Sequence, residues 1–152
     1  MKAIVTDQTF LRKITEEVKE GEDISEIVST LFNELKHSEE IRGVEAFGFA
    51  ANQFGYSKRI FVMKLKPYSP ICIVNPFITK ERGSQVREEG CFSIPQTIKE
   101  PLVVKRPMQI TVKGLNQYLK PVKYKLSGLQ ARVACHEVDH LNGKLIIDYK
   151  EE

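Results

Sequence analysis

The sequence predicts an α+β fold, in which antiparallel or mixed β-sheets pack around a helix near the C-terminal end and a further helix lies in the N-terminal part. Three observations lead to this prediction. An amphipathic segment covers residues 24–41, short β-rich segments fill the middle of the chain, and clear helix start and stop signals delimit residues 128–141. No repeat or linker-like change of composition interrupts the 152 residues, so we expect a single domain over residues 1–152.

The N-terminal helix is expected over about residues 24–41, because apolar residues recur there at helical spacing. These residues are Ile24, Ile27, Val28, Leu31, Phe32 and Leu35. Asp23 followed by Glu26 has the spacing of a capping box, which would fix the start of the helix. A loop rich in small residues, 43–55, is expected to follow.

The β-rich segments predict five strands, at residues 59–65, 71–78, 102–105, 108–113 and 121–125. Asn75-Pro76 should interrupt the second strand, because proline removes a donor from the hydrogen-bond ladder. Gly83-Ser84 is expected to form a turn before the segment 86–95, and residues 114–117 a hairpin turn. The last helix should begin after Ser127, which has capping-box spacing to Gln130, and end at residues 142–143.

The total composition limits the classes of function. The chain is 41% hydrophobic and 28% charged, which is typical of a soluble globular protein. Its formal charge of +3 is too small to indicate nucleic-acid binding, and no apolar stretch approaches the length of a membrane span. No targeting segment is visible at the N-terminus, and three cysteines make a disulfide framework improbable. We therefore expect a cytoplasmic enzyme with free thiols.

The segment CHEVDH, residues 135–140, indicates a metal site on the last helix. His136 and His140 are one turn apart, so both imidazoles project to one side. Glu137 is rotated by about 100° from His136, which lets it reach a metal-bound water without being a ligand. This division of roles is that of a metal-dependent hydrolase. The alternative is two helix-surface histidines beside an ordinary acidic residue.

A catalytic metal usually needs a third protein ligand, which must come from elsewhere in the chain. His37 lies among polar residues late in the first helix and is expected to be solvated. Cys72 lies in an apolar run and is expected to be a buried small hydrophobe. Cys135 precedes His136 directly, so the helix points it away from both histidines. Cys91 follows a glycine that lets the backbone approach closely, and it is our predicted third ligand.

Three motifs together carry a family resemblance. EGCFS at residues 89–93 and HEVDH at residues 136–140 resemble the signature pair of the peptide deformylases, and GFAANQ at residues 48–53 resembles that family's glutamine-containing motif. The motifs occur in the family's order, and the similarity covers nearly the whole chain. The resemblance implies removal of the N-formyl group from the initiator methionine of new polypeptides. It also implies one divalent ion, iron(II) in the cell with zinc, nickel or cobalt possible, held by Cys91, His136 and His140.

The resemblance also implies roles for further residues. Glu137 would act first as base and then as acid. The side-chain amide of Gln53 and the backbone N–H of Phe92 would stabilise the oxyanion, although Gln53 could instead only bond loop backbone. Asp139 is expected to be a structural partner, and Glu89 with Arg106 a supporting ion pair. The residues expected to bind the substrate are Phe47, Gly48, Phe49, Gly90, Arg87 and Arg132.

Two of these residues depart from the family pattern, which normally has apolar residues at the positions of Arg87 and Arg132. Helix spacing places Arg132 on the His136 face, where a cation beside a metal ion is costly unless it is paired. Three interpretations compete. The arginines lie along apolar surface with their heads in water, or they bind a carboxylate of an unusual acidic formylated substrate. Alternatively, Arg132 pairs with an internal acid such as Glu45 or Glu88 and narrows the pocket.

Two other functions share part of this pattern. A metallopeptidase would have the paired histidines and the glutamate, but would typically take a carboxylate or a third histidine as its remaining ligand. A binding module that has lost catalysis would commonly lack a ligand or the glutamate, and both are present here. Many deformylases continue into a C-terminal helix thought to aid ribosome contact. The sequence stops at residue 152 without it, so a formylated peptide is the expected partner and ribosome proximity is an open expectation.

Overall fold

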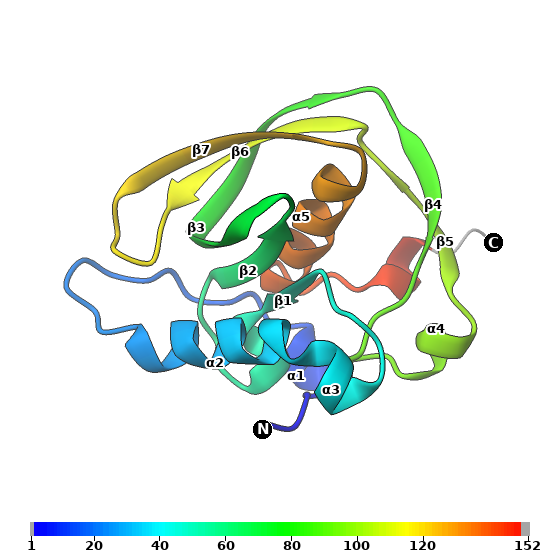
Figure 1. The fold of residues 1–152 in the computed structure, drawn as a ribbon, viewed down its shortest axis with the longest axis horizontal. Coiled ribbons are helices and arrows are strands. Elements are labelled where there is room, and N and C mark those ends of the chain that lie inside the picture. Colours follow the sequence, from blue (N-terminus) through cyan, green and yellow to red (C-terminus); the bar gives the residue numbers. More distant parts are fainter. Residues whose placement is uncertain (1, 150–152) are drawn as a thin grey trace.

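Two antiparallel sheets organise the protein (Figure 1). The larger sheet has the strand order β1-β2-β3-β6-β7, and the smaller one pairs β4 with β5. The computed structural model describes residues 2–149. The strands are β1 (Gly48–Ala50), β2 (Ile60–Leu65), β3 (Tyr68–Arg82), β4 (Gln85–Glu89), β5 (Leu102–Arg106), β6 (Gln109–Leu115) and β7 (Pro121–Ser127).

Two helices cover opposite faces of the larger sheet. Helix α5 (Gly128–Leu141) packs on one face through a core that includes Phe61, Met63, Ile73, Val112 and Leu126. Helix α2 (Ser25–Lys36) covers β1 and β2 on the other face, over a core that includes Leu31, Leu35, Phe49, Val62 and Val74. The α+β class with antiparallel sheets around the C-terminal helix and an N-terminal helix is therefore confirmed.

Short elements complete the chain. They are α1 (Gln8–Leu11), α3 (Ser38–Arg42), α4 (Gln96–Lys99) and the 3₁₀ turns η1 (Ala51–Phe54) and η2 (Ile146–Tyr149). Apart from α3, which falls within the helix expected over residues 24–41, neither these nor β1 were predicted, because they are too short to show a clear period. In the described part of the chain, no helix combines the length and the apolar character that crossing a membrane requires.

The prediction of one helix over residues 24–41 was wrong in detail. The backbone leaves helical geometry at His37 (φ −104°, ψ 18°), so α2 ends at Lys36 and α3 begins at Ser38. This break buries Ser38, whose hydroxyl oxygen accepts from the backbone N–H of Ala46 at 2.8 Å. The capping box was also wrong. The Asp23 carboxylate accepts from the N–H and hydroxyl of Ser25, with no side-chain cap from residue 24.

Two further predictions need correction. Asn75-Pro76 does not end β3, because the register with β6 shifts between Val74 and Phe77 and this bulge accommodates the proline. Asn75 adopts φ 51° there, and its amide exchanges hydrogen bonds with the backbone of Val18 at 2.8 and 2.9 Å. Helix α5 begins at the predicted place, but without a side-chain cap from residue 127. The side chain of Gln130 donates to a backbone carbonyl of residue 66 instead.

Candidate metal centre and active site

The C-terminal end of α5 is held by side chains from the N-terminal half of the chain. The Asn52 amide donates to the His140 carbonyl at 2.8 Å. Arg59 and Thr15 both donate to the Leu141 carbonyl at 2.9 Å. These are carbonyls that a helix end leaves without intrahelical partners. The bonds therefore fix the axial position of the helix that presents both histidines.

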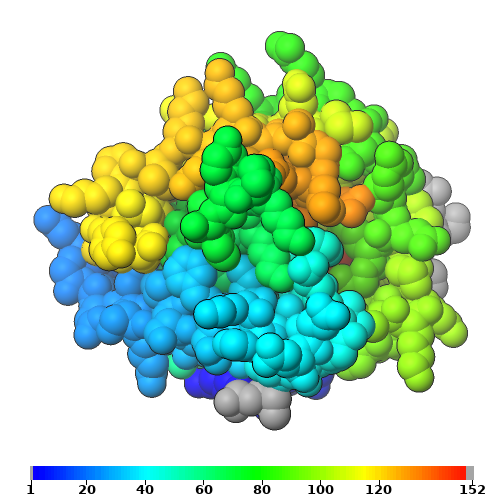
Figure 2. Space-filling view, viewed as in Figure 1, coloured from blue at the N-terminus to red at the C-terminus, as the bar shows by residue number. Residues whose placement is uncertain are grey.

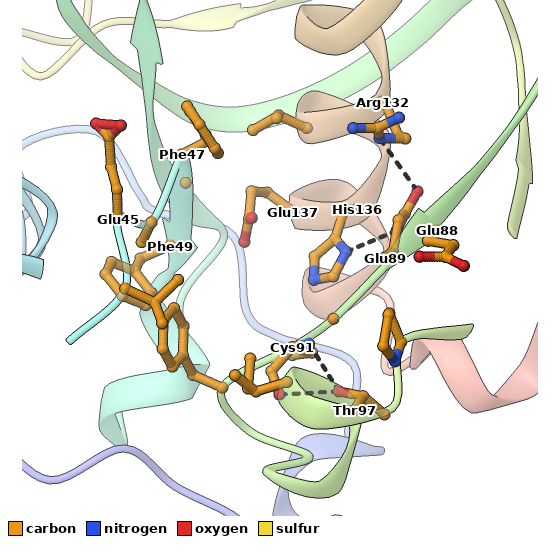
Figure 3. A pocket seen from close by; sticks show the side chains of 18 of the residues that line it. Glu45, Phe47, Phe49, Glu88, Glu89, Cys91, Thr97, Arg132, His136 and Glu137 are labelled. Carbon is orange, nitrogen blue, oxygen red and sulfur yellow. Dashed lines mark hydrogen bonds and ion pairs between the residues drawn. The ribbon is translucent and has the colours of Figure 1, made fainter. Parts of the chain in front are cut away.

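The three predicted ligands meet beside this helix. Figure 3 shows two of them, Cys91 and His136. The donor atoms of Cys91, His136 and His140 all lie within 4.8 Å of one another, and Cys91 Sγ is 3.3 Å from His140 Nε2. Cys91 comes from the segment after β4, where Thr97 Oγ1 accepts from its backbone N–H at 2.8 Å and donates in turn to the Ile94 carbonyl at 2.6 Å. This hydroxyl holds the tight turn that carries the thiol to α5. Thr97 is not predictable from the sequence, because no periodic signal marks such a contact.

The protonation of the Cys91 thiol and of the His136 ring suits the binding of a divalent metal ion. Burial disfavours a charged Cys91, but the two imidazoles outweigh it and hold the thiol pKa well below its ordinary value. Burial likewise opposes a charged His136, but the hydrogen bonds that its ring donates to Cys91 and Glu89 raise its pKa. His136 Nδ1 lies 3.0 Å from Glu89 Oε1, which leaves Nε2 facing the thiol. A thiolate and two oriented imidazoles are a soft donor set that transition-metal ions and zinc accept.

Glu89 joins His136 to a buried ion pair. Arg106 donates through Nε and Nη2 to the two oxygens of Glu89, both at 3.0 Å. Burial raises the pKa of Glu89, but His136 and Arg106 together lower it to about 2. Arg106 and Tyr149 also donate to Asp139, so Asp139 is the structural partner that we expected. Glu89, held in place by Arg106, thus orients the ligand His136 without being a ligand itself.

The other two cysteines lie in the cores. Cys72 belongs to the core beneath α2, and Cys135 to the core between α5 and the larger sheet. Burial raises the pKa of each thiol to about 12. Both are therefore neutral small hydrophobes, as expected from the sequence.

Glu137 is buried next to the ligands, with a close fit to β1. Among the described residues, its Oε1 atom has no hydrogen-bond partner. A Cβ atom at Gly48 would lie 2.9 Å from Glu137 Oε2 and 2.9 Å from Val133 Cγ1. Burial raises the pKa of Glu137, while the histidines lower it less. A carboxyl group whose pKa is raised toward neutrality can both take and give a proton.

Gln53 and Phe92 approach the same place from the opposite side. Gln53 Oε1 accepts from the Ala50 N–H at 2.9 Å, and its Nε2 donates to Ser93 Oγ at 3.2 Å and lies 3.8 Å from Cys91 Sγ. The Phe92 ring packs against Phe49, with 5.9 Å between the ring centroids. The Gln53 amide thus bonds its loop through oxygen and faces the ligands through nitrogen.

A cavity of about 310 Å³ opens beside these groups, between the 44–49 segment, the end of β4 and α5. Most of the predicted site residues line it. They are Phe47, Gly48, Phe49, Gln53, Gly90, Cys91, Phe92, Arg132, His136 and Glu137. His140 lies behind them and is 2% exposed. Gly90 approaches Thr97, since a Cβ atom there would lie 2.7 Å from the Thr97 carbonyl oxygen.

The two arginines have different surroundings. Arg132 lines the cavity, and its Nε lies 3.8 Å from Glu89 Oε2, so the internal acid is Glu89. Glu45, which we had considered, pairs with lysines 64 and 66 instead. Arg87 is exposed, donates to the carbonyl of residue 86 at 2.9 Å, and is not among the residues that line the cavity.

The fold and the donor set place this protein among the metal-binding hydrolases. The family model for polypeptide deformylases matches residues 1–152. A peptide deformylase from Thermoanaerobacter pseudethanolicus is 38% identical over 142 residues, which cover 91% of this chain and 87% of that protein. The crystal structure of the Thermotoga maritima peptide deformylase has a TM-score of 0.84 and 33% identity, over 100% of this chain and 99% of that one. The Ehrlichia chaffeensis structure has a TM-score of 0.85 and 30% identity, over 100% and 89%. The chain belongs to the polypeptide deformylase family.

Proposed function

We propose that residues 1–152 act as one catalytic domain that removes the N-formyl group from the initiator methionine of new polypeptides. The products are formate and a free N-terminal amine. The observation that carries this proposal is the meeting of Cys91, His136 and His140 with Glu137 at one cavity, in a chain of the polypeptide deformylase family. The three free cysteines agree with a reducing compartment such as the cytoplasm.

Cys91, His136 and His140 would hold one divalent ion, which we propose to be iron(II) in the cell. When bound, such an ion lowers the pKa of water and polarises a carbonyl oxygen. The low pKa of the Cys91 thiol and the Glu89 bond to His136 support this ligand set. Zinc, nickel and cobalt suit the same donors. Metal analysis of anaerobically purified protein distinguishes them.

Glu137 moves the proton in this proposal. Its unpartnered Oε1 takes a proton from the attacking water and later delivers it to the amine nitrogen as the carbon–nitrogen bond breaks. Gln53 Nε2 donates to the oxygen of the formyl group as negative charge develops on it, together with the backbone N–H of Phe92. To do so, the Gln53 Nε2 group has only to break its hydrogen bond to Ser93 Oγ. The amide stays in place because Gln53 Oε1 still accepts from the Ala50 N–H.

The proposal is tested by formate release from N-formyl peptides that begin with methionine, leucine, aspartate or glutamate. We expect a clear preference for methionine. Glu137→Gln should keep the metal and lose activity by about 10²- to 10⁴-fold, the usual contribution of general acid–base catalysis. Cys91→Ser should lose both metal and activity. If Cys91→Ser retains bound metal and full formate release, the site assignment is wrong.

A further inference from the structure

The face of the larger sheet that α2 covers over β1 and β2 continues, uncovered, over β6, β7 and the second half of β3. Five exposed cations lie on this part, which we call the cationic face: Lys80, Arg82, Lys113, Lys123 and Lys125. Among residues 2–149, no carboxylate forms a salt bridge with any of them. In Figure 2 the β6–β7 hairpin (yellow) is open to solvent beside α2 (blue to cyan).

The strand register places these side chains together. Lys113 is paired directly with Lys123, and Thr111 is paired with both Lys125 and Lys80. Directly paired residues of antiparallel strands share a face. The alternate residues Ile110, Val112 and Leu126 point to the opposite face, into the core with α5. The five cations are therefore one continuous surface.

This surface is unfavourable for the isolated protein. Like charges directly opposite each other in a sheet are destabilising, as at Lys113 and Lys123. The segment 102–127, which supplies β5, β6 and β7, contains no aspartate or glutamate to offset them. Outside residues 102–127 the chain carries a small net negative charge. The total formal charge of +3 therefore does not reveal how much positive charge is concentrated on the cationic face. A polyanionic partner would remove this repulsion.

Aromatic side chains lie among the cations. Phe77 is paired with Lys113 on the same face and is 54% exposed. Tyr118, at the tip of the β6–β7 hairpin, is 74% exposed. A cavity of about 540 Å³ adjoins three of the cations, Lys80, Arg82 and Lys125, and is also lined by Glu81. Cations that follow a phosphate backbone, interleaved with aromatic rings on which bases stack, are the pattern of a single-strand nucleic-acid surface.

We propose that the cationic face binds single-stranded RNA, with phosphates on the five cations and a base on Phe77. The choice of RNA over other polyanions rests on the proposed function, because an enzyme whose substrates are new polypeptides works where RNA is abundant. Binding itself does not depend on deformylation. A membrane surface is a poorer partner, because Phe77 is the one large apolar side chain that the register places among these five cations.

The test is the anisotropy of a labelled single-stranded RNA oligonucleotide, titrated with the protein at several salt concentrations. The double variant Lys80→Glu with Lys123→Glu should bind at least tenfold more weakly. Its log–log salt dependence should be shallower by about 1.4, since two phosphate contacts are lost at about 0.7 each. The second substitution places a glutamate opposite Lys113, so the hairpin should remain stable.

The matched control is Lys36→Glu with Lys99→Glu, which makes the same charge change at exposed residues of α2 and α4. This control should stay within twofold of wild type. Equal weakening in both double variants would mean that only net charge matters and would overturn the proposal. Absence of RNA binding at 50 mM salt would overturn it too. Stronger binding to acidic phospholipid vesicles, lost in the same variant, would assign the face to a membrane instead.

Formate release from a short N-formyl peptide is measured on all of these proteins. It should be unchanged, because none of the substituted residues lines the candidate active site. If the Lys80→Glu, Lys123→Glu variant releases formate as wild type does but binds RNA more weakly, the result supports RNA binding by the cationic face and does not bear on deformylation. Absence of release from every protein, with RNA binding intact, would refute the deformylase proposal and leave this one standing.

Discussion

Gly48 shows how a single absent side chain can position a catalytic group. The residue is a glycine because Glu137 and Val133 occupy the space of a Cβ atom. Gly48→Ala should displace the Glu137 carboxyl and lower kcat by about 10²-fold, as small misplacements of reacting groups do. Bound metal, measured by elemental analysis, should be unchanged. An alanine variant with wild-type kcat would contradict this role.

Gly90 provides the contrasting substitution. A Cβ atom at Gly90 would meet the backbone carbonyl of Thr97, and backbone cannot move as easily as a side chain. Gly90→Ala should therefore distort the turn that carries Cys91, so that the variant loses metal as well as activity. If Gly90→Ala kept full metal occupancy while losing activity, Gly90 would act on the substrate and not on the ligand.

Arg132 is the residue whose charge is least expected in the cavity. Its pairing with Glu89 is long at 3.8 Å, because both Glu89 oxygens already accept from Arg106 and Oε1 also faces His136. Arg132→Leu should raise kcat/KM for a formyl-methionyl peptide several-fold, since an apolar wall gains about 0.8 kcal/mol per methylene buried against it. Arg87→Leu is the matched control and should change little. A fall in kcat/KM for Arg132→Leu would show that the guanidinium binds the substrate.

At the scale of elements, the end of α5 depends on a residue from another part of the chain. Asn52→Ala removes the side-chain donor to the His140 carbonyl and leaves that oxygen only the Gly143 N–H at 3.1 Å. The unfolding free energy should fall by about 0.5–1.5 kcal/mol, the net contribution of one hydrogen bond. Metal affinity should fall by about 10- to 100-fold, the usual effect of residues that orient ligands. Chelator competition measures the affinity, with exposed Asn33→Ala as control. Unchanged affinity would show that His140 is held without Asn52.

Long elements with a clear period were predictable from the sequence. Helix α5 and the five strands lie near their predicted positions, and spacing alone put His136, Glu137 and His140 on one helix. The short elements were not predictable, because their stability comes from tertiary contacts such as those of Thr97 and Asn52. The partner of Arg132 was missed for the same reason. Glu89 is adjacent to the expected Glu88, but a strand points neighbouring residues to opposite faces.

At the scale of the whole molecule, the metal ion should hold the two sheets together through its ligands. Cys91 follows β4 of the smaller sheet, whereas the histidines lie on the helix that packs on the larger sheet. Chelation should lower Tm by about 10 °C, because an ion present at 1,000 times its Kd stabilises by about 4 kcal/mol. Calorimetry with and without chelator measures this. Cys91→Ser should show a much smaller difference, and an equal difference would mean that the ion binds elsewhere.

The Arg12–Asp148 pair joins the two ends of the described chain. Arg12 donates to Asp148 at 2.6 Å and, with the Leu145 N–H, holds the Asp148 pKa below its ordinary value of about 3.9. A lowered pKa contributes stability above the unfolded value, and this is lost as pH falls through the folded value. The Tm difference between wild type and Asp148→Asn should therefore be constant above about pH 5 and shrink below pH 4. A difference that grew on acidification would contradict the pairing.

The bulges of β3 impose a rule on how this chain can change in length. Register shifts between Val74 and Phe77 and between Ile78 and Lys80 each insert one residue relative to β6. A bulge takes up its extra residue locally, so the residue pairs on either side of it keep their faces with or without that residue. Deleting one residue from a bulge would therefore leave Glu81 paired with Ile110 and Arg82 paired with Gln109. Single insertions and deletions compatible with this fold should occur at residues 75–76 and 79, whereas a single deletion in the regularly paired β7 would turn every side chain beyond it to the other face.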